Sequence, residues 1–433
     1  MEVPTNKQKN VVFTIVARNY IGLAQVLEKS VKANSESDFY IFVADEFADN
    51  DGMELLPLNA LIAKTKIGIN DAVWEEMAFK YNLVEFCTAI KPACIQYFLN
   101  QGYEKVIYLD PDIYVFGSME PIFSKLNEVS IILTPHIVTA HSPFEGDYPD
   151  YLFLVNGTFN LGFLAVKEGA ATRDMLHWWD YRLKDQCFFD NEMGMATDQK
   201  WMNMLPSFFD SKDLHISQNL GFNVAPWNYH ERELYLENET IMVSDRINKH
   251  KQQTTALTFV HFSGYDYRSF ANDKVAHKKE DLKGFDDLAL IFDIYAAALK
   301  ESDLFTFYKY PYTYGSFKNG KVINHFQRRI YRRLLSEGLA PANPFDVAEG
   351  TFYGRLKKNR LVDHAVTSSD KVTNKTIKGF DKKLQLVNLF FRILKFIVGI
   401  RRYSIMIRFM RRYLREENQA FLFDKSFDYK KMW

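Results

Sequence analysis

VIYLDPDIYVF, residues 106–116, places two carboxylates between two apolar runs. Asp110 and Asp112 stand two residues apart, and like charges at that spacing repel, so each raises the pKa of the other unless a cation lies between them. Two interpretations are open for this stretch alone. It is either a surface turn with two solvated acids or a metal site at the end of a buried strand.

Strand and helix patterns alternate around this stretch. Apolar, β-branched runs predict strands, and helical spacing of apolar residues predicts helices over 20–34 and 84–102. The predicted strands cover residues 11–17, 39–45, 105–110, 129–136 and 159–166. This alternation predicts an α/β fold with a mostly parallel sheet covered by helices on both faces. Ligands of such sheets bind beyond the carboxyl ends of the strands, which favours the metal site over the surface turn.

The composition is that of a large folded protein. The 433 residues are 47% hydrophobic and 15% aromatic, which suits two or three domains and excludes a disordered chain. Basic and acidic residues balance at 54 each, and we expect no nucleic-acid partner. The N-terminus is polar, and no window of about 18 uncharged apolar residues predicts a transmembrane helix.

The cysteines point to a reducing compartment. Cys87, Cys94 and Cys187 are odd in number and lack the spacing of metal ligands, so we expect buried thiols and a cytoplasmic protein, peripheral on the inner face of a membrane if the C-terminal region binds lipid.

Two enzyme classes place Asp-x-Asp after a strand. In one, the carboxylates hold a divalent cation that binds substrate phosphates, as in transferases that use nucleotide sugars. In the other, haloacid-dehalogenase-like phosphohydrolases, the first Asp is a nucleophile. Those enzymes carry the motif near the N-terminus with Thr or Val two residues after it, whereas here Tyr114 follows and the motif lies past residue 100.

Five stretches in order carry a family resemblance. They are FTIVARNYIGLAQVLEKS (13–30), TAIKPACIQYFLNQGYEKVIYLDPDIYVF (88–116), FNLGFLAV (159–166), TDQKWMN (197–203) and VHFSGYD (260–266). Together they resemble GT-A fold (Rossmann-like) nucleotide-sugar glycosyltransferases, in particular the retaining group of glycogenin and bacterial lipopolysaccharide galactosyltransferases, and bacterial surface-polysaccharide glycosyltransferases.

The resemblance implies a metal site and a donor site. Asp110, Asp112 and His261 would bind the metal, and an imidazole beside two carboxylates favours Mn²⁺ over Mg²⁺. The nucleoside-diphosphate sugar would contact Ala17, Asn19, Tyr20, Lys91 and Gly264, in addition to the two aspartates. Structural alternatives are a core histidine at 261, a solvated helix lysine at 91 and simple packing of Tyr20.

The resemblance also implies catalytic residues. Asn160 would face the donor or acceptor sugar, and Asp198 and Gln199 would lie by the reacting centre; the alternative for Asp198 is an acid that favours a helix N-terminus. Leu161 stands where the family has Ala, and Gly264 is followed by Tyr265-Asp266 instead of Lys-Pro-Trp. The family's lysine at this place binds the diphosphate, and Arg268 or Lys274 would then replace it. Retaining and inverting chemistry both stay open, and in the inverting case Asp198 would be the general base.

The stretch GFNVAPWNYHERELY (221–235) mixes amides with an aromatic ring. Aromatic rings stack on sugar faces and amides bind hydroxyls, so we expect Asn223, Trp227, Asn228 and Arg232 on the acceptor side. The alternative is a buried loop whose amides are satisfied within the protein.

The C-terminal region is apolar and basic at once. Polar residues recur every three or four positions on an otherwise apolar stretch, at Gln385, Asn388, Arg392, Lys395, Gly399 and Arg402. Such a helix over 384–415 suits an anionic membrane surface, or docking on its own domain or a second subunit of a homo-oligomer.

Three regions and one function follow from these patterns. We expect a GT-A catalytic domain over 1–270, an aromatic and basic helical extension over 271–345, and a basic amphipathic helical region over 346–433. The expected function is metal-dependent transfer of a sugar to a glycan or lipid-linked acceptor in bacterial surface-polysaccharide synthesis. The alternatives are a phosphohydrolase and a non-catalytic carbohydrate-binding or assembly subunit.

Overall fold

The computed structural model describes residues 9–47, 52–249, 254–267, 269, 284–362, 379–424 and 427. The chain forms two compact units, one of residues 1–70 and 83–313 and the other of residues 71–82 and 314–433. The expected boundary at residue 270 falls at the start of residues 270–283, which lie outside the described part of the chain. It and the expected boundary at residue 345 stay predictions.

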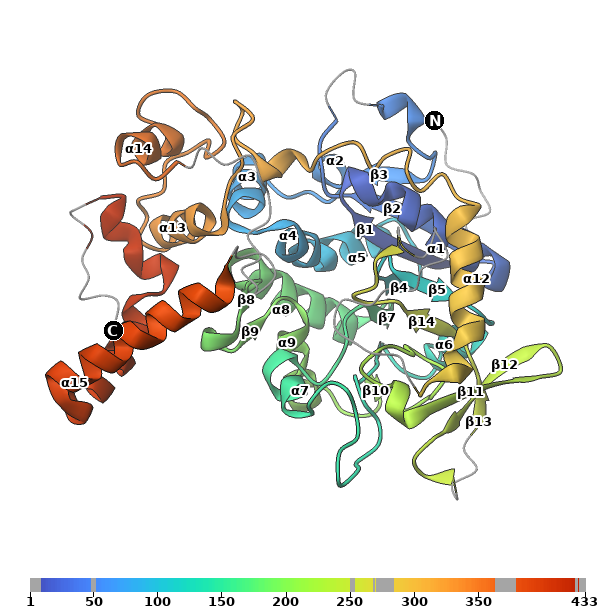
Figure 1. Ribbon diagram of the computed structural model, residues 1–433. Helices are drawn as coiled ribbons and strands as arrows, with labels where there is room; N and C mark the ends of the chain where they lie inside the picture. Colours follow the sequence, from blue (N-terminus) through green and yellow to red (C-terminus); the bar gives the residue numbers. More distant parts are fainter. Residues whose placement is uncertain are drawn as a thin grey trace. The chain divides into compact units, whose positions relative to one another are not determined.

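The first unit is built on a seven-stranded sheet with the order β10-β6-β7-β4-β1-β2-β3 (Figure 1). All neighbours pair in parallel except β7, which runs antiparallel to both β4 and β6. The predicted α/β fold with a mostly parallel mixed sheet is therefore confirmed. Its strands are β1 (Asn10–Val16), β2 (Asp38–Val43), β3 (Ala60–Ile62), β4 (Lys105–Leu109), β6 (Ile131–Leu133), β7 (Phe163–Lys167) and β10 (Leu214–Ile216).

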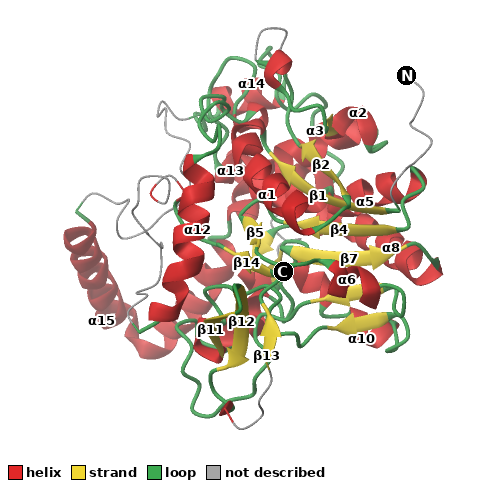
Figure 2. Ribbon diagram, turned by 90° about the vertical axis from the view of Figure 1, so that its right-hand side faces the viewer, coloured by secondary structure: helices red, strands yellow, loops and turns green. Residues whose placement is uncertain are grey.

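Helices cover both faces of this sheet because its strands are apolar on both faces (Figure 2). On one face, Val12 and Ile107 share a core cluster with Leu27 of α1. On the other, the ring of Phe13 lies 5.2 Å from that of Phe98 in α5. The helices of this unit are α1 (Ile21–Asn34), α2 (Ala63–Lys66), α4 (Leu83–Ala89), α5 (Lys91–Asn100), α6 (Glu120–Lys125), α7 (Tyr151–Asn156), α8 (Ala170–Gln186), α9 (Gln199–Met202), α10 (Leu205–Phe208) and α12 (Ala289–Lys300).

The single helix expected over 84–102 is two helices, α4 and α5. Pro92 lies in the first turn of α5, where its missing N–H costs no hydrogen bond. Because of this break, Lys91 is the first residue of a new helix.

Three small sheets complete the first unit. The strand β5 (Ile113–Val115) pairs antiparallel with β14 (Phe259–His261). The pair β8 (Phe189–Asp190) and β9 (Met195–Ala196) precedes α9. The meander of β11 (Arg232–Glu237), β12 (Thr240–Asp245) and β13 (Thr254–Ala256) was not expected from the sequence. The apolar runs of β11 and β12, LYL and IMV, are short, and most residues of the two strands are at least partly exposed.

The second unit is helical. It comprises α3 (Asp71–Lys80), α13 (His325–Ser336), α14 (Phe352–Lys358), α15 (Phe380–Tyr413) and the 3₁₀ segment η8 (Glu416–Leu422). Phe79 and Tyr331 pack in its core with their rings 4.7 Å apart. The predicted helical C-terminal extension is confirmed for the described residues. Among the described helices, none is long and apolar enough to span a bilayer.

Candidate active site

The two aspartates lie where β4 ends. Asp110 follows Leu109, and the amide of Ile113 donates to the carbonyl of Asp110 over 3.1 Å, which closes a tight turn. The turn leads into β5, and β14 pairs with β5 so that His261 is opposite Ile113. The strand pairing therefore brings His261, about 150 residues away in sequence, beside both carboxylates.

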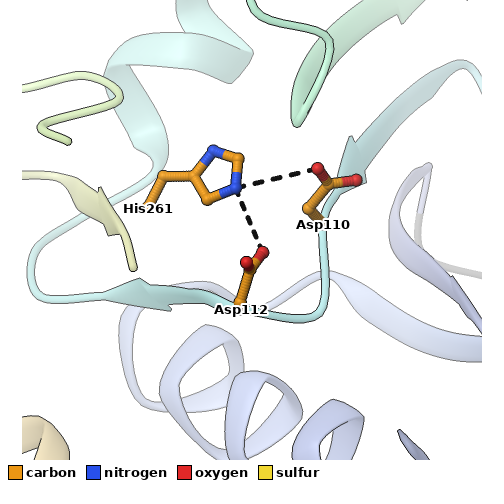
Figure 3. A group of neighbouring side chains, drawn as sticks. All are labelled: Asp110, Asp112 and His261. Atoms are coloured by element: carbon orange, nitrogen blue, oxygen red, sulfur yellow. Dashed lines mark ion pairs between the residues drawn. The ribbon is translucent and has the colours of Figure 1, made fainter. Parts of the chain in front are cut away.

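The three predicted metal ligands converge (Figure 3). The Nε2 atom of His261 is 3.1 Å from Oδ1 of Asp112 and 3.7 Å from Oδ2 of Asp110. One ligand atom from each residue lies within 4.8 Å of the others. His261 is buried, whereas the aspartates keep 29% and 32% of their side chains exposed. One cation could therefore contact all three and still reach a substrate.

The electrostatics of the cluster are those of a site short of positive charge. Burial raises the pKa of Asp110, and the charges of Lys91 and His261 offset only part of this rise. Burial disfavours the imidazolium of His261, but the carboxylates of Asp112 and Asp110 outweigh it and raise the pKa of His261 above its ordinary value. The raised pKa of His261 therefore reflects the negative charge of the two carboxylates, which a bound cation would neutralise.

The hydrogen bonds behind His261 fit a metal ligand. The amide of Gly162 donates to Oδ1 of Asn160 over 3.1 Å, so this oxygen is an acceptor. The same oxygen is 3.2 Å from Nδ1 of His261, which must therefore carry the hydrogen. In the neutral ring the lone pair is then on Nε2, directed at the carboxylates. A backing partner that sets the tautomer in this way is typical of metal-bound histidines.

A cavity of about 500 Å³ opens beside the aspartates. Six predicted residues line it, namely Ala17, Asn19, Tyr20, Asp110, Asp112 and Gly264. The sequence reasoning missed its other aromatic walls, which include Tyr108, Tyr267, Tyr295 and Tyr308. A larger hollow of about 690 Å³ is lined by Lys9, Lys32 and Glu120 among others. None of the predicted residues line that hollow, and it lies at the opposite ends of the strands.

No family model matches the sequence. The uncharacterized protein YfnF of Bacillus subtilis (strain 168) is 24% identical over 290 residues, which cover 66% of this chain and 90% of that protein. The solved structure of the galactosyltransferase LgtC with donor and acceptor sugar analogues aligns with 68% of this chain and 96% of its own, at 16% identity and a TM-score of 0.41.

Two further solved structures show the same range of similarity. The bifunctional glycosyltransferase WbbM aligns over 70% of this chain and 51% of its own, at 13% identity and a TM-score of 0.39. The glycosyltransferase GlyE of Streptococcus pneumoniae TIGR4 aligns over 72% and 67%, at 14% identity and a TM-score of 0.34. Each of these three solved glycosyltransferase structures is similar to part of this chain.

The basic residue of the GT-A resemblance, Lys91, is in a buried ion pair. Its ammonium is 2.5 Å from Oδ2 of Asp198, and it also donates to the carbonyl of Leu161 over 2.8 Å. Lys91 is not solvated. Asp198 occupies the N-cap position of α9, but its side chain makes no capping hydrogen bond there, and its other oxygen accepts from the hydroxyl of Thr197. The structure thus brings these two predicted residues together. It places Lys91 behind the cavity wall, and its contact with a diphosphate stays a prediction.

Tyr108 connects this ion pair to the metal cluster. Its hydroxyl donates to Oδ1 of Asp110 over 2.5 Å, and the ammonium of Lys91 lies 4.1 Å from its ring centroid. Its place two residues before Asp110, a spacing that puts both side chains on one side of an extended chain, was the available signal in the sequence. Gln199 is apart from this chain of contacts, because its side-chain amide donates to the carbonyl of Asn156.

The segment 221–235, whose end belongs to β11, is almost entirely buried and only partly satisfied: among the described residues, Oδ1 of Asn223 and Nε1 of Trp227 have no hydrogen-bond partner. Asn228 donates to the carbonyls of His136 and Asn223, and Arg232 donates to those of Leu220 and Phe222. These contacts favour the structural interpretation of Asn228 and Arg232. Trp227, whose ring lies 5.3 Å from that of His261, joins the loop to the cluster. Of the substitutes considered for the missing lysine, Arg268 and Lys274 both lie outside the described residues.

Proposed function

We propose that this protein is a metal-dependent glycosyltransferase that uses a nucleoside-diphosphate sugar. The observation that carries the proposal is the convergence of Asp110, Asp112 and His261 where the two aspartates line the cavity of about 500 Å³. Two carboxylates and a neutral imidazole make a donor set suited to Mn²⁺. The cavity has the size and the aromatic lining of a nucleotide site.

Each residue then has a role in the proposed reaction. Asp110, Asp112 and His261 would hold the metal, which stabilises the charge of the leaving diphosphate. Tyr20 and Tyr267, whose rings are 5.5 Å apart, would enclose the base and ribose beside Ala17 and Asn19. Gly264 would let the backbone approach the phosphates. The Lys91–Asp198 pair would orient Tyr108 and, through it, Asp110.

The acceptor and the biological setting are further parts of the proposal. The motif resemblance to bacterial surface-polysaccharide transferases supports a hexose donor, a glycan or lipid-linked acceptor, and a place on the cytoplasmic side of the membrane. Asn160 faces His261 in this structure, so we place it among the residues that support the metal and not against the sugar.

A phosphohydrolase is less consistent with the geometry. A nucleophilic Asp110 would need an oxygen free to attack phosphorus in line. Here one oxygen accepts from Tyr108 and the other faces His261, so both already interact with protein groups.

The test is incubation of the full-length protein with a panel of nucleotide sugars, with Mn²⁺, Mg²⁺ or EDTA. We expect release of nucleoside diphosphate that requires the metal, and a loss of about 100-fold or more for Asp112→Asn, on the scale of losing transition-state charge stabilisation. Asp210→Asn, at a solvated ion pair, is the matched control and should keep full activity. Turnover of simple phosphomonoesters but not of nucleotide sugars would show the phosphohydrolase. Glycan binding without turnover of either would show the binding subunit.

A further inference from the structure

Helix α15 leaves a broad apolar surface without cover from the described protein. Gly399 has φ 76° and ψ 158°, a conformation open only to glycine, and it divides α15 into residues 380–398 and 400–413. None of the residues of α15 is buried. Figure 1 shows α15 as a ribbon near the C-terminus. The rings of Phe391 and Tyr403 are 6.3 Å apart, so the two segments contact each other through aromatic side chains across the bend.

The first segment has three distinct faces. The polar residues Gln385, Asn388, Arg392 and Lys395 follow a spacing of three and four and form one stripe. The partly buried Phe391, Leu394 and Val398 form a second stripe. The third face is apolar and exposed, with every member more than half accessible: Leu386, Leu389, Phe390, Ile393, Phe396, Ile397 and, just past the bend, Ile400.

The exposed apolar residues form one continuous face and are not scattered singly over the surface. Phe396 is 86% exposed, Ile397 72% and Ile400 70%. Contiguous apolar patches beyond a few hundred Å² mark interaction surfaces. These three side chains flank the bend at Gly399.

The charge of the helix selects the partner. Over 380–413 there are nine basic residues, namely Lys382, Lys383, Arg392, Lys395, Arg401, Arg402, Arg408, Arg411 and Arg412, and one acidic residue, Asp381. The chain as a whole has no net charge, so this excess is local. A second copy of the same helix would bring like charges together, whereas an anionic lipid surface complements both the charge and the apolar face.

We propose that α15 docks the protein on a bilayer that contains anionic lipid, with Phe396, Ile397 and Ile400 inserted at the level of the headgroups and the basic residues against the lipid phosphates. The basis is independent of the proposed enzymatic activity. Because no described helix spans a bilayer, the docking is interfacial and reversible.

The test is flotation of the full-length protein with vesicles of phosphatidylcholine alone or mixed with phosphatidylglycerol. We expect flotation with the mixed vesicles in about 0.1 M salt and its loss in about 1 M salt, as the Debye length falls from about 10 Å to about 3 Å. Arg401→Gln with Arg402→Gln should weaken binding about fivefold per charge. Phe396→Glu with Ile397→Glu should abolish it.

Matched controls lie in the other unit. Leu58→Glu changes a fully exposed apolar residue and Lys212→Gln an exposed basic residue, and both variants should float like the parent protein. Failure of the parent to float with mixed vesicles in low salt overturns the proposal, as does equal flotation of the Phe396/Ile397 variant. Light scattering of the lipid-free protein adds a third check: a dimer that dissociates in that variant, without vesicle binding, would assign the face to a second copy.

Discussion

Gly162 makes room for the imidazole of His261. A Cβ at this position would lie 2.4 Å from Cε1 and 2.7 Å from Nδ1 of that ring, closer than atoms can approach. We predict that Gly162→Ala displaces the ring and weakens Mn²⁺ binding on the order of tenfold or more, measured by isothermal titration calorimetry. Gly169→Ala, where a Cβ meets no atom within 4 Å, is the control. Unchanged Mn²⁺ affinity in Gly162→Ala would show that His261 is not a ligand.

The Lys91–Asp198 pair is the other decisive contact at the residue scale. Both side chains are nearly inaccessible to solvent, so removing one charge leaves the other buried and unpaired. We predict that Lys91→Met lowers the free energy of unfolding by about 3–5 kcal/mol, and that adding Asp198→Leu restores part of the loss. Urea unfolding measures both. Lys184→Met breaks the more exposed pair with Asp180 and should cost at most about 0.5 kcal/mol; a similar cost for Lys91→Met would contradict the prediction.

At the scale of elements, the connection from β6 to α7 holds a buried neutral histidine. Burial lowers the pKa of His136 to about 4, and its ring packs between those of Phe153 and Trp227. His136 takes up a proton below about pH 6.5 in the unfolded chain but only near pH 4 in the folded chain. The stability that the folded protein gains from a neutral His136 is therefore present above pH 6.5 and is lost as the pH falls towards 4.

We predict that His136→Gln reduces the pH dependence of stability between pH 6.5 and 4 by about 3 kcal/mol. Urea unfolding at a series of pH values measures it. His177→Gln, at an exposed position of α8, is the control and should follow the parent. The same acid slope in His136→Gln as in the parent would assign the effect to other groups.

At the scale of the whole molecule, the metal should stabilise one unit alone. All three ligands come from the first unit, and binding to the folded state stabilises it by about 2.7 kcal/mol when the metal is at 100 times its dissociation constant. We predict that Mn²⁺ raises the calorimetric transition of the first unit and leaves that of the second in place. Asp112→Asn should lose the shift, and a shift that persists in this variant would place the metal elsewhere.

Much of the fold and part of the site follow from contiguous residues. The strands leading to Val16 and Leu109, and the carboxylates after Leu109, are visible because apolar periodicity and a strand end are local features. The late histidine was found by the order of motifs and not by any local rule. The excess of basic residues over 380–413 is also visible in the sequence, because it is a matter of composition.

Tertiary structure decided the rest. The antiparallel course of β7, the pairing of β5 with β14 that brings in His261, and the ion pair of Lys91 with Asp198 across 107 residues all depend on which segments meet in space. A lysine at a helix start and an aspartate before another helix look solvated in the sequence, because nothing local shows that both are buried. Only packing removes the water from such groups, and a charge that is buried in this way needs a partner of opposite charge. The sequence alone therefore determined the residue types of the site, and the fold determined their contacts.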